Sequence, residues 1–168
     1  MKQHQRSVGK NDEWLTPEWI TAALGEFDLD PCSPVSRPWA TASRHLTIEE
    51  DGLRQRWSGR VWLNPPFNRK ERPKWMEKMA YHRNGVMLIP AATETEAFVM
   101  LVWGTADSVL FVRSRPHFHY VDGRRSEANC GTALALVSYS EADTLILRAS
   151  GLGTVVAVNG SPLCPFEL

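Results

Sequence analysis

One four-residue stretch, Asn64-Pro65-Pro66-Phe67, combines residue types that could bind a flat ligand and act on it. The prolines have fixed φ angles and no backbone N–H, and a residue before a proline is kept out of helical geometry. We therefore expect an apolar strand to end at Asn64 and the chain to continue extended, with its carbonyl groups free. An amide, a free carbonyl and a ring held together can grip a flat molecule that bears an exocyclic amino group. This chemistry suits transfer of a methyl group to an amino nitrogen.

The composition is that of one soluble globular domain. The 168 residues are 43% hydrophobic and 23% charged, and 19 basic residues balance 19 acidic ones. This balance gives no global attraction to nucleic acid. No apolar run is long enough to span a membrane, and the polar residues 1–12 lack the apolar centre of a signal peptide. The cysteines, Cys32, Cys130 and Cys164, show no paired spacing, so we expect no disulfide framework, no metal and a reducing, cytoplasmic location.

Positive charge is nevertheless concentrated in two places. One cluster follows the four-residue stretch, and the other lies between residues 113 and 125. Charge runs are usually solvated loops, but the position of these two favours contact with nucleic acid. The residues predicted for this role are Asn68, Arg69, Lys70, Arg115, His117, Arg124 and Arg125, with Arg72, Lys74 and Arg113 in the same clusters. His117 and His119 could also face one side of a strand as a metal pair, but no third ligand is evident.

Periodicity and capping signals predict alternating strands and helices. Residues 1–12 are expected to form a loose arm, and residues 13–168 a single domain. Strands are predicted at 27–30, 60–63, 86–89, 108–112, 132–139 and, at an edge, 154–158, with a further strand near 44–47. Helices are predicted at 16–24, 72–82, 93–103 and 140–151, with a short one near 52–57 left open. The expected caps are Thr16, Thr93 and Ser140.

Strands that alternate with helices predict a parallel, doubly wound α/β sheet with helices on both faces. Ligands bind beyond the carboxyl ends of the strands in such sheets. Asp30-Pro31 and Asn64 each follow a predicted strand. We therefore expect their side chains to meet in one cleft.

Three motifs in a fixed order resemble those of the phage-type DNA N6-adenine methyltransferases, which are related to Dam-type enzymes. The motifs are Thr16-Pro17, residues 27–32 and Asn64-Pro65-Pro66-Phe67. Residues 51–57, 61–63 and 88–91 add supporting matches, so the resemblance covers roughly residues 12–139. It implies a Rossmann-like methyltransferase sheet of reduced size, S-adenosylmethionine as cofactor, DNA as partner and, for a phage-encoded protein, the host cytoplasm.

The resemblance also implies a role for each matched residue. Asn64 and the Pro65 carbonyl would accept hydrogen bonds from the adenine N6 amino group, and Phe67, after Pro66, would stack on the flipped base. The implied cofactor-binding residues are Trp14, Thr16, Pro17, Asp30, Pro31, Asp51 and Asn64. Glu49 and Glu50 are alternatives to Asp51 as the acid for the ribose. The sequence departs from the family pattern in two ways: no glycine-rich loop follows the first strand, and Phe67 stands where tyrosine is frequent.

Other functions are compatible with the same motif. Enzymes that methylate an RNA adenine, cytosine N4 or a protein glutamine amide also use Asn-Pro-Pro-aromatic sequences, and a DNA-binding module without catalysis could keep the fold. Cys32 follows a proline, as in cytosine C5 methyltransferases, but at the wrong strand end, so we expect a small buried residue. No room remains for a recognition domain. Target reading would fall to residues 68–74 and 113–129, which predicts a short or loosely specified site, with a homodimer as one way to add surface.

Overall fold

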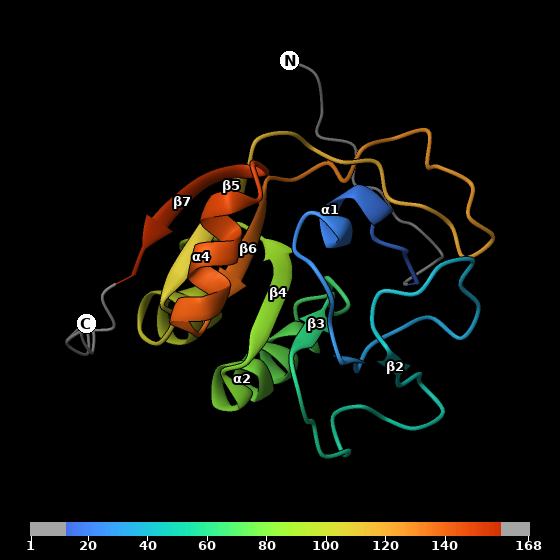
Figure 1. Ribbon diagram of the computed structural model, residues 1–168, viewed down its shortest axis with the longest axis horizontal. Helices are drawn as coiled ribbons and strands as arrows, with labels where there is room; N and C mark the ends of the chain where they lie inside the picture. Colours follow the sequence, from blue (N-terminus) through green and yellow to red (C-terminus); the bar gives the residue numbers. More distant parts are fainter. Residues whose placement is uncertain (1–12, 159–168) are drawn as a thin grey trace.

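A computed structural model describes residues 13–158, and the predicted arm at 1–12 and Cys164 lie outside the described residues. These residues form one seven-stranded sheet with the strand order β2-β1-β3-β4-β6-β5-β7 (Figure 1). The strands are β1 (Leu29–Asp30), β2 (Arg44–His45), β3 (Val61–Leu63), β4 (Gly85–Pro90), β5 (Ser108–Val112), β6 (Leu134–Ser138) and β7 (Gly153–Ala157). The helices are α1 (Glu18–Ala22), α2 (Arg72–His82), α3 (Glu96–Phe98), which continues as the π-helix η1 (Val99–Trp103), and α4 (Glu141–Ala149).

The sheet is mixed, which corrects the prediction of a parallel sheet. Strands β1 to β4 form parallel pairs, whereas β6 is antiparallel to both β4 and β5, and β7 is antiparallel to β5. Adjacent parallel strands need a crossover connection, usually a helix, between them. Residues 113–133, which join β5 to β6, contain no helix and return the chain as a long hairpin. The buried apolar pattern of β6 could not reveal its direction.

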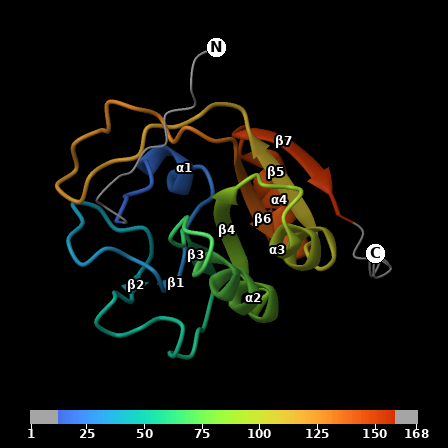
Figure 2. The ribbon, with the colours of Figure 1, turned by 180° about the vertical axis from the view of Figure 1, so that it is seen from behind.

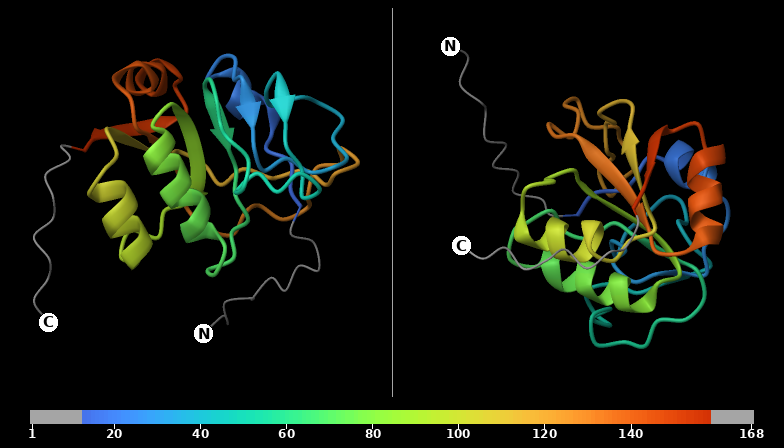
Figure 3. Two further views of the ribbon diagram at one scale, coloured as in Figure 1. Left: turned by 90° about the horizontal axis from the view of Figure 1, so that it is seen from below. Right: turned by 90° about the vertical axis from the view of Figure 1, so that its left-hand side faces the viewer.

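Helices cover both faces of the sheet (Figure 3). Helices α2, α3 and η1 pack on one face, and α1 and α4 on the other. The central strand β4 shows the alternation that this layering requires. Met87 and Ile89 belong to the core under α2 and η1, and Val86 and Leu88 belong to the core under α1 and α4. Among residues 13–158, no helix is both long enough and apolar enough to cross a membrane.

Several predicted elements are confirmed and others are corrected. Helix α2 and strand β5 have the predicted bounds, and the Ser140 side chain caps α4 by accepting a hydrogen bond from the Asp143 N–H (3.1 Å). Residues 52–57 form turns instead of a helix. The N-cap of α3 is Thr95, whose hydroxyl accepts a hydrogen bond from the Phe98 N–H. The prediction of Thr93 as this cap was wrong. The Thr95 N–H bonds to the Ala92 carbonyl (3.1 Å), so a turn holds the residues before it.

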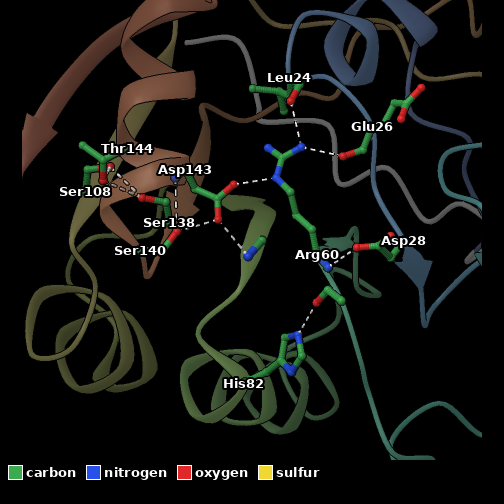
Figure 4. Close-up of polar contacts among 12 residues, drawn as sticks. Leu24, Glu26, Asp28, Arg60, His82, Ser108, Ser138, Ser140, Asp143 and Thr144 are labelled. Atoms are coloured by element: carbon green, nitrogen blue, oxygen red, sulfur yellow. Dashed lines mark hydrogen bonds and ion pairs between the residues drawn. The ribbon is translucent and has the colours of Figure 1, made fainter.

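A buried ion pair ties the two halves of the sheet together (Figure 4). Arg60, just before β3, donates from Nε to Asp143 of α4 (2.7 Å) and from Nη1 to the carbonyls of Leu24 and Glu26. The second Asp143 oxygen accepts from the Gly85 N–H at the start of β4 (2.9 Å). This network fixes α1, β3, β4 and α4 relative to one another. It thereby holds the strand that ends at the Asn64 motif.

Candidate active site

A small cavity with polar and apolar lining residues lies where β1 and β3 end. Its lining residues are Trp14, Leu15, Thr16, Asp30, Cys32, Ser33, Pro34, Arg37, Thr41, Trp62 and Asn64. The predicted site residues Trp14, Thr16, Asp30 and Asn64 are therefore brought together, and for Asp30 and Asn64 the positions of the two strand ends led us to expect this. The cavity volume is about 10 Å³, which is room for about one water molecule. A larger ligand would need the lining segments to move apart.

Asn64 presents an unused acceptor to this cavity. Its Nδ2 lies 3.5 Å from the Trp14 carbonyl, and its Oδ1 is buried without a hydrogen-bond partner among residues 13–158. A buried carbonyl oxygen without a donor costs free energy, so native structures rarely keep one without a reason. The Oδ1 atom is thus suited to accept a hydrogen bond from a ligand.

The rest of the Asn64 motif turns away from the cavity and leads into α2. Pro65 is buried, Pro66 and Phe67 are half-buried, and none of the three lines the cavity. The Phe67 ring contacts Phe118 edge to face, with ring centroids 6.0 Å apart. The Phe67 carbonyl accepts from Arg72 Nη1 (3.2 Å), and Arg72 is buried, so its assignment to a basic surface cluster was wrong.

Thr16 has a different local role from the one predicted. Helix α1 is only five residues long, its cap position is Pro17, and no side chain caps it. The Thr16 hydroxyl is instead buried in the cavity wall without a hydrogen-bond partner among the described residues. Thr16 contributes a second unpartnered polar atom beside that of Asn64.

Asp30 is a buried carboxylate with its hydrogen bonds supplied by neighbouring residues. It accepts hydrogen bonds from the Cys32 N–H (3.1 Å) and from the Thr41 hydroxyl. Burial is the largest influence on this group and raises its pKa from 3.8 to about 6. The bonds from Thr41 and Cys32 and the charge of Arg37 act in the opposite direction. The Asp30 carboxyl is thus mostly ionised at neutral pH, and keeping this charge buried costs free energy.

Ionisation of Asp30 should make the protein less stable as the pH rises. The pKa of Asp30 is higher in the folded than in the unfolded protein. The protonated carboxyl therefore makes its full contribution to stability below about pH 4, and this contribution is lost by about pH 6. The loss should amount to about 3 kcal/mol. Urea unfolding of the wild type and of Asp30→Asn should be compared across this pH range. As the pH rises, the wild type should lose this amount of unfolding free energy relative to the variant. A difference independent of pH would contradict the assignment.

The loop after β1 lacks glycines of its own, but a distant glycine packs against it. A Cβ atom on Gly52 would lie 1.9 Å from the Pro31 carbonyl oxygen, so only glycine allows this approach. The Gly52 carbonyl in turn accepts from Trp57 Nε1 (2.8 Å) and Lys78 Nζ (3.1 Å), which attach the turn to α2. Asp51 is exposed in this turn with φ 52° and pairs with Arg54, so it does not line the cavity.

The N-terminal segment that lines the cavity is held in place by the long β5–β6 connection. The backbones of Leu15 and His119 exchange two hydrogen bonds (2.9 and 3.0 Å). Trp39 contacts the His119 ring and donates from Nε1 to the Thr16 carbonyl (3.2 Å). Trp39 and Thr41 were missed in the sequence because the stretch around them shows no periodicity. Only the folded chain reveals that they support Thr16 and Asp30.

The predicted nucleic-acid-binding residues are mostly exposed. Arg69, Lys70, Arg115, Arg124 and Arg125 are exposed, and so is Asn68, whose side chain accepts from the Lys70 and Glu71 N–H groups. His117 is half-buried and its Nδ1 lies 2.8 Å from the Ser126 carbonyl. Within residues 13–158, no group of three or more histidine, cysteine or acidic side chains is arranged to hold a metal ion.

The mixed α/β sheet, with a small cavity at the ends of two of its parallel strands, is compatible with a methyltransferase-like fold. The family model described as DNA N-6-adenine-methyltransferase (Dam) matches residues 3–150. The chain belongs to this family and is an adenine-specific DNA methyltransferase. No curated protein and no solved structure matches the chain.

Proposed function

We propose that this protein transfers a methyl group from S-adenosylmethionine directly to N6 of an adenine extruded from DNA. The observation that supports this most strongly is the buried, unpartnered Oδ1 of Asn64 at the end of β3. An acceptor there can take a hydrogen bond from the N6 amino group, draw its lone pair out of conjugation and stabilise the developing positive charge. Such a transfer needs correct placement of the two reactants and no covalent enzyme intermediate.

The cavity residues fit the methionine end of the cofactor. The unpartnered Thr16 hydroxyl and the Asp30 carboxylate line the same cavity as Asn64. A hydroxyl and a buried carboxylate are suitable partners for the polar groups of an amino acid, and an ionised Asp30 favours an ammonium group. When bound, S-adenosylmethionine supplies a methyl group activated by a sulfonium. Trp14, Pro17 and Pro31 remain proposed neighbours of the cofactor, and Asp51 remains a proposed ribose ligand although it lies outside the cavity.

Cofactor binding separates this proposal from a DNA-binding module without catalysis. Titration calorimetry should detect a stoichiometric complex between the protein and S-adenosylmethionine. Because ordered segments must move to admit the cofactor, a conformational change should accompany binding. Absence of a stoichiometric complex would remove the basis of the enzymatic proposal.

Phe67 is proposed to stack on the extruded base. Stacking on an aromatic side chain contributes about 1–3 kcal/mol per base. We therefore expect Phe67→Ala to weaken binding of DNA that carries an unpaired adenine by about tenfold or more, and Phe67→Tyr to be tolerated. Fluorescence anisotropy with the two variants would measure this. An inactive but folded Phe67→Tyr variant would indicate that the ring serves packing against Phe118 instead.

Target specificity is proposed to be low. The proposed reading loops, residues 68–74 and 113–129, carry exposed arginines, and phosphate contacts from these arginines would position DNA without reading sequence. Sequencing of methylated adenines in DNA exposed to the protein should reveal a short or degenerate site. A long unique site would contradict this part of the proposal.

A further inference from the structure

The connection between β5 and β6 passes beside α1 and contains a hairpin (Figure 2). His119 pairs with Leu15 on one side and with Arg125 on the other. The Tyr120 N–H donates to the Arg124 carbonyl (2.9 Å), and the Gly123 N–H donates to the Tyr120 carbonyl (2.8 Å), which closes the tip. We call residues 116–126 the recognition hairpin. It is held in place by the same segment that carries Trp14 and Thr16.

One face of the recognition hairpin carries a row of aromatic rings. Phe118 and Tyr120 are two positions apart in an extended segment, so their side chains point to the same face. Phe118 contacts Phe67 of the Asn64 motif, with centroids 6.0 Å apart, and Tyr120 contacts Trp14 at 5.0 Å. Phe118 is buried, whereas Phe67, Tyr120 and Trp14 are partly exposed. The row therefore begins at the proposed base site and continues to the hairpin tip.

Arg124 ends this row in an orientation that suits stacking. Its guanidinium carbon lies 5.4 Å from the centre of the Tyr120 ring. Asp122 accepts from Arg124 Nε (2.7 Å) and from its backbone N–H (2.9 Å), which fixes the side chain and compensates its charge. The Arg124 side chain is still 76% exposed. A compensated guanidinium held over a ring is better suited to carry a base on its plane than to bind a phosphate.

The distance between Phe118 and Tyr120 along the hairpin exceeds the distance between successive bases of a DNA strand. Two residues of an extended strand advance about 6.6 Å. Successive bases of one DNA strand are about 3.4 Å apart along the helix axis. A base on Phe67 therefore leaves the Tyr120–Arg124 pair within reach of another nucleotide of the same strand. Arg125, next to Arg124 in the hairpin, and Arg113 and Arg115, earlier in the same connection, are exposed and form no ion pair among residues 13–158, so they provide positive charge for the strand.

We propose that Tyr120 and Arg124 form a second stacking site, which binds a nucleobase flanking the target adenine on the same strand. The inference rests on the proposed function, because the first position of the row is the proposed adenine site at Phe67. The bound strand would then be unstacked at the target and at one nearby nucleotide. Arg125 would contact the phosphate backbone beside this second base.

The test uses short single-stranded DNA with one adenine and 2-aminopurine placed in turn at each neighbouring position. Wild-type protein should quench 2-aminopurine fluorescence at a flanking position. Tyr120→Leu, which keeps apolar bulk, should lose this quenching and bind about 5- to 100-fold more weakly, whereas Tyr120→Phe should retain it. Tyr81→Leu, at a tyrosine that is 91% exposed on α2, and Arg148→Ala on α4 are matched controls that should behave as wild type.

The salt dependence of binding distinguishes stacking from phosphate contact. Arg125→Ala should reduce the slope of log K against log salt by about 0.7, the value for one phosphate contact on a single strand. Tyr120→Leu and Arg124→Ala should weaken binding with little change in slope. A reduced slope for Arg124→Ala, or quenching that persists in Tyr120→Leu, would overturn the second stacking site.

The inference and the proposed function can fail separately. Quenching by wild-type protein that does not methylate DNA would contradict the proposed function and support the stacking site. Methylating wild-type protein without flanking quenching would overturn the stacking site alone. Unfolding of Tyr120→Leu is detected by circular dichroism, and Arg124→Ala, at an exposed side chain, then provides the deciding loss of quenching.

Discussion

Asn64→Ala should lose DNA methylation by about a hundredfold or more, because its Oδ1 would otherwise stabilise charge on the reacting nitrogen. Cofactor affinity should stay within about tenfold of the wild type, since the interaction is used mainly in the transition state. Transfer of labelled methyl groups to DNA measures the first quantity, and calorimetry the second. Asn64→Asp should retain more activity than Asn64→Ala because it keeps a hydrogen-bond acceptor. Its second carboxylate oxygen would, however, face the Trp14 carbonyl oxygen without a proton between them.

Asn84→Ala is the matched control for this experiment. Asn84 is exposed, and its side chain makes no hydrogen bond within the described part of the chain, although its carbonyl accepts from the Val61 N–H (3.0 Å). Its activity and stability should match the wild type. Full activity in Asn64→Ala would contradict the proposed acceptor role. Loss of cofactor binding together with activity would instead place Asn64 mainly in the cofactor site.

Asp143→Ala should destabilise the fold by about 3–5 kcal/mol, because it leaves the largely buried Arg60 without its charged partner. The Asp143 side chain is 2% exposed and that of Arg60 is 17% exposed. The substitution also removes the acceptor for the Gly85 N–H and Ser140 hydroxyl, so β4 and the start of α4 lose a connection (Figure 4). The midpoint and slope of urea unfolding would give the change in free energy.

Asp107→Ala provides the comparison at an exposed ion pair. Arg83 and Asp107 are 3.1 Å apart, but their side chains are 50% and 39% exposed. An exposed pair contributes only about 0–1 kcal/mol, so this variant should unfold almost as the wild type does. Equal losses of unfolding free energy in Asp143→Ala and Asp107→Ala would show that burial does not strengthen the Arg60–Asp143 pair.

The elements with strong local signals could be predicted from the sequence. Helix α2 has Pro73 in its first turn, and its predicted bounds match the structure. The meeting of Asp30 and Asn64 in one cavity also followed from their positions after parallel strands. In both cases the local signal agrees with the tertiary packing.

Features that depend on distant contacts could not be predicted. The direction of β6 is set by a helix-free connection, and the buried pattern of the strand is the same in either direction. Thr16 resembles a helix cap but lies in the cavity wall, because Pro17 takes the cap position. Arg72 looks like a member of a basic run, yet it folds under the motif to bind the Phe67 carbonyl. The need for glycine at position 52 becomes visible only in the fold, where its backbone packs against the Pro31 carbonyl.

We propose that the adenine amino group is the site of methylation and that Asn64 acts on it. Mass spectrometry of nucleosides from DNA incubated with the protein and S-adenosylmethionine tests this most directly. We expect N6-methyldeoxyadenosine from the wild type and at most about a hundredth of that amount from Asn64→Ala. Methylation of cytosine alone, or equal N6-methyldeoxyadenosine from both proteins, would contradict it.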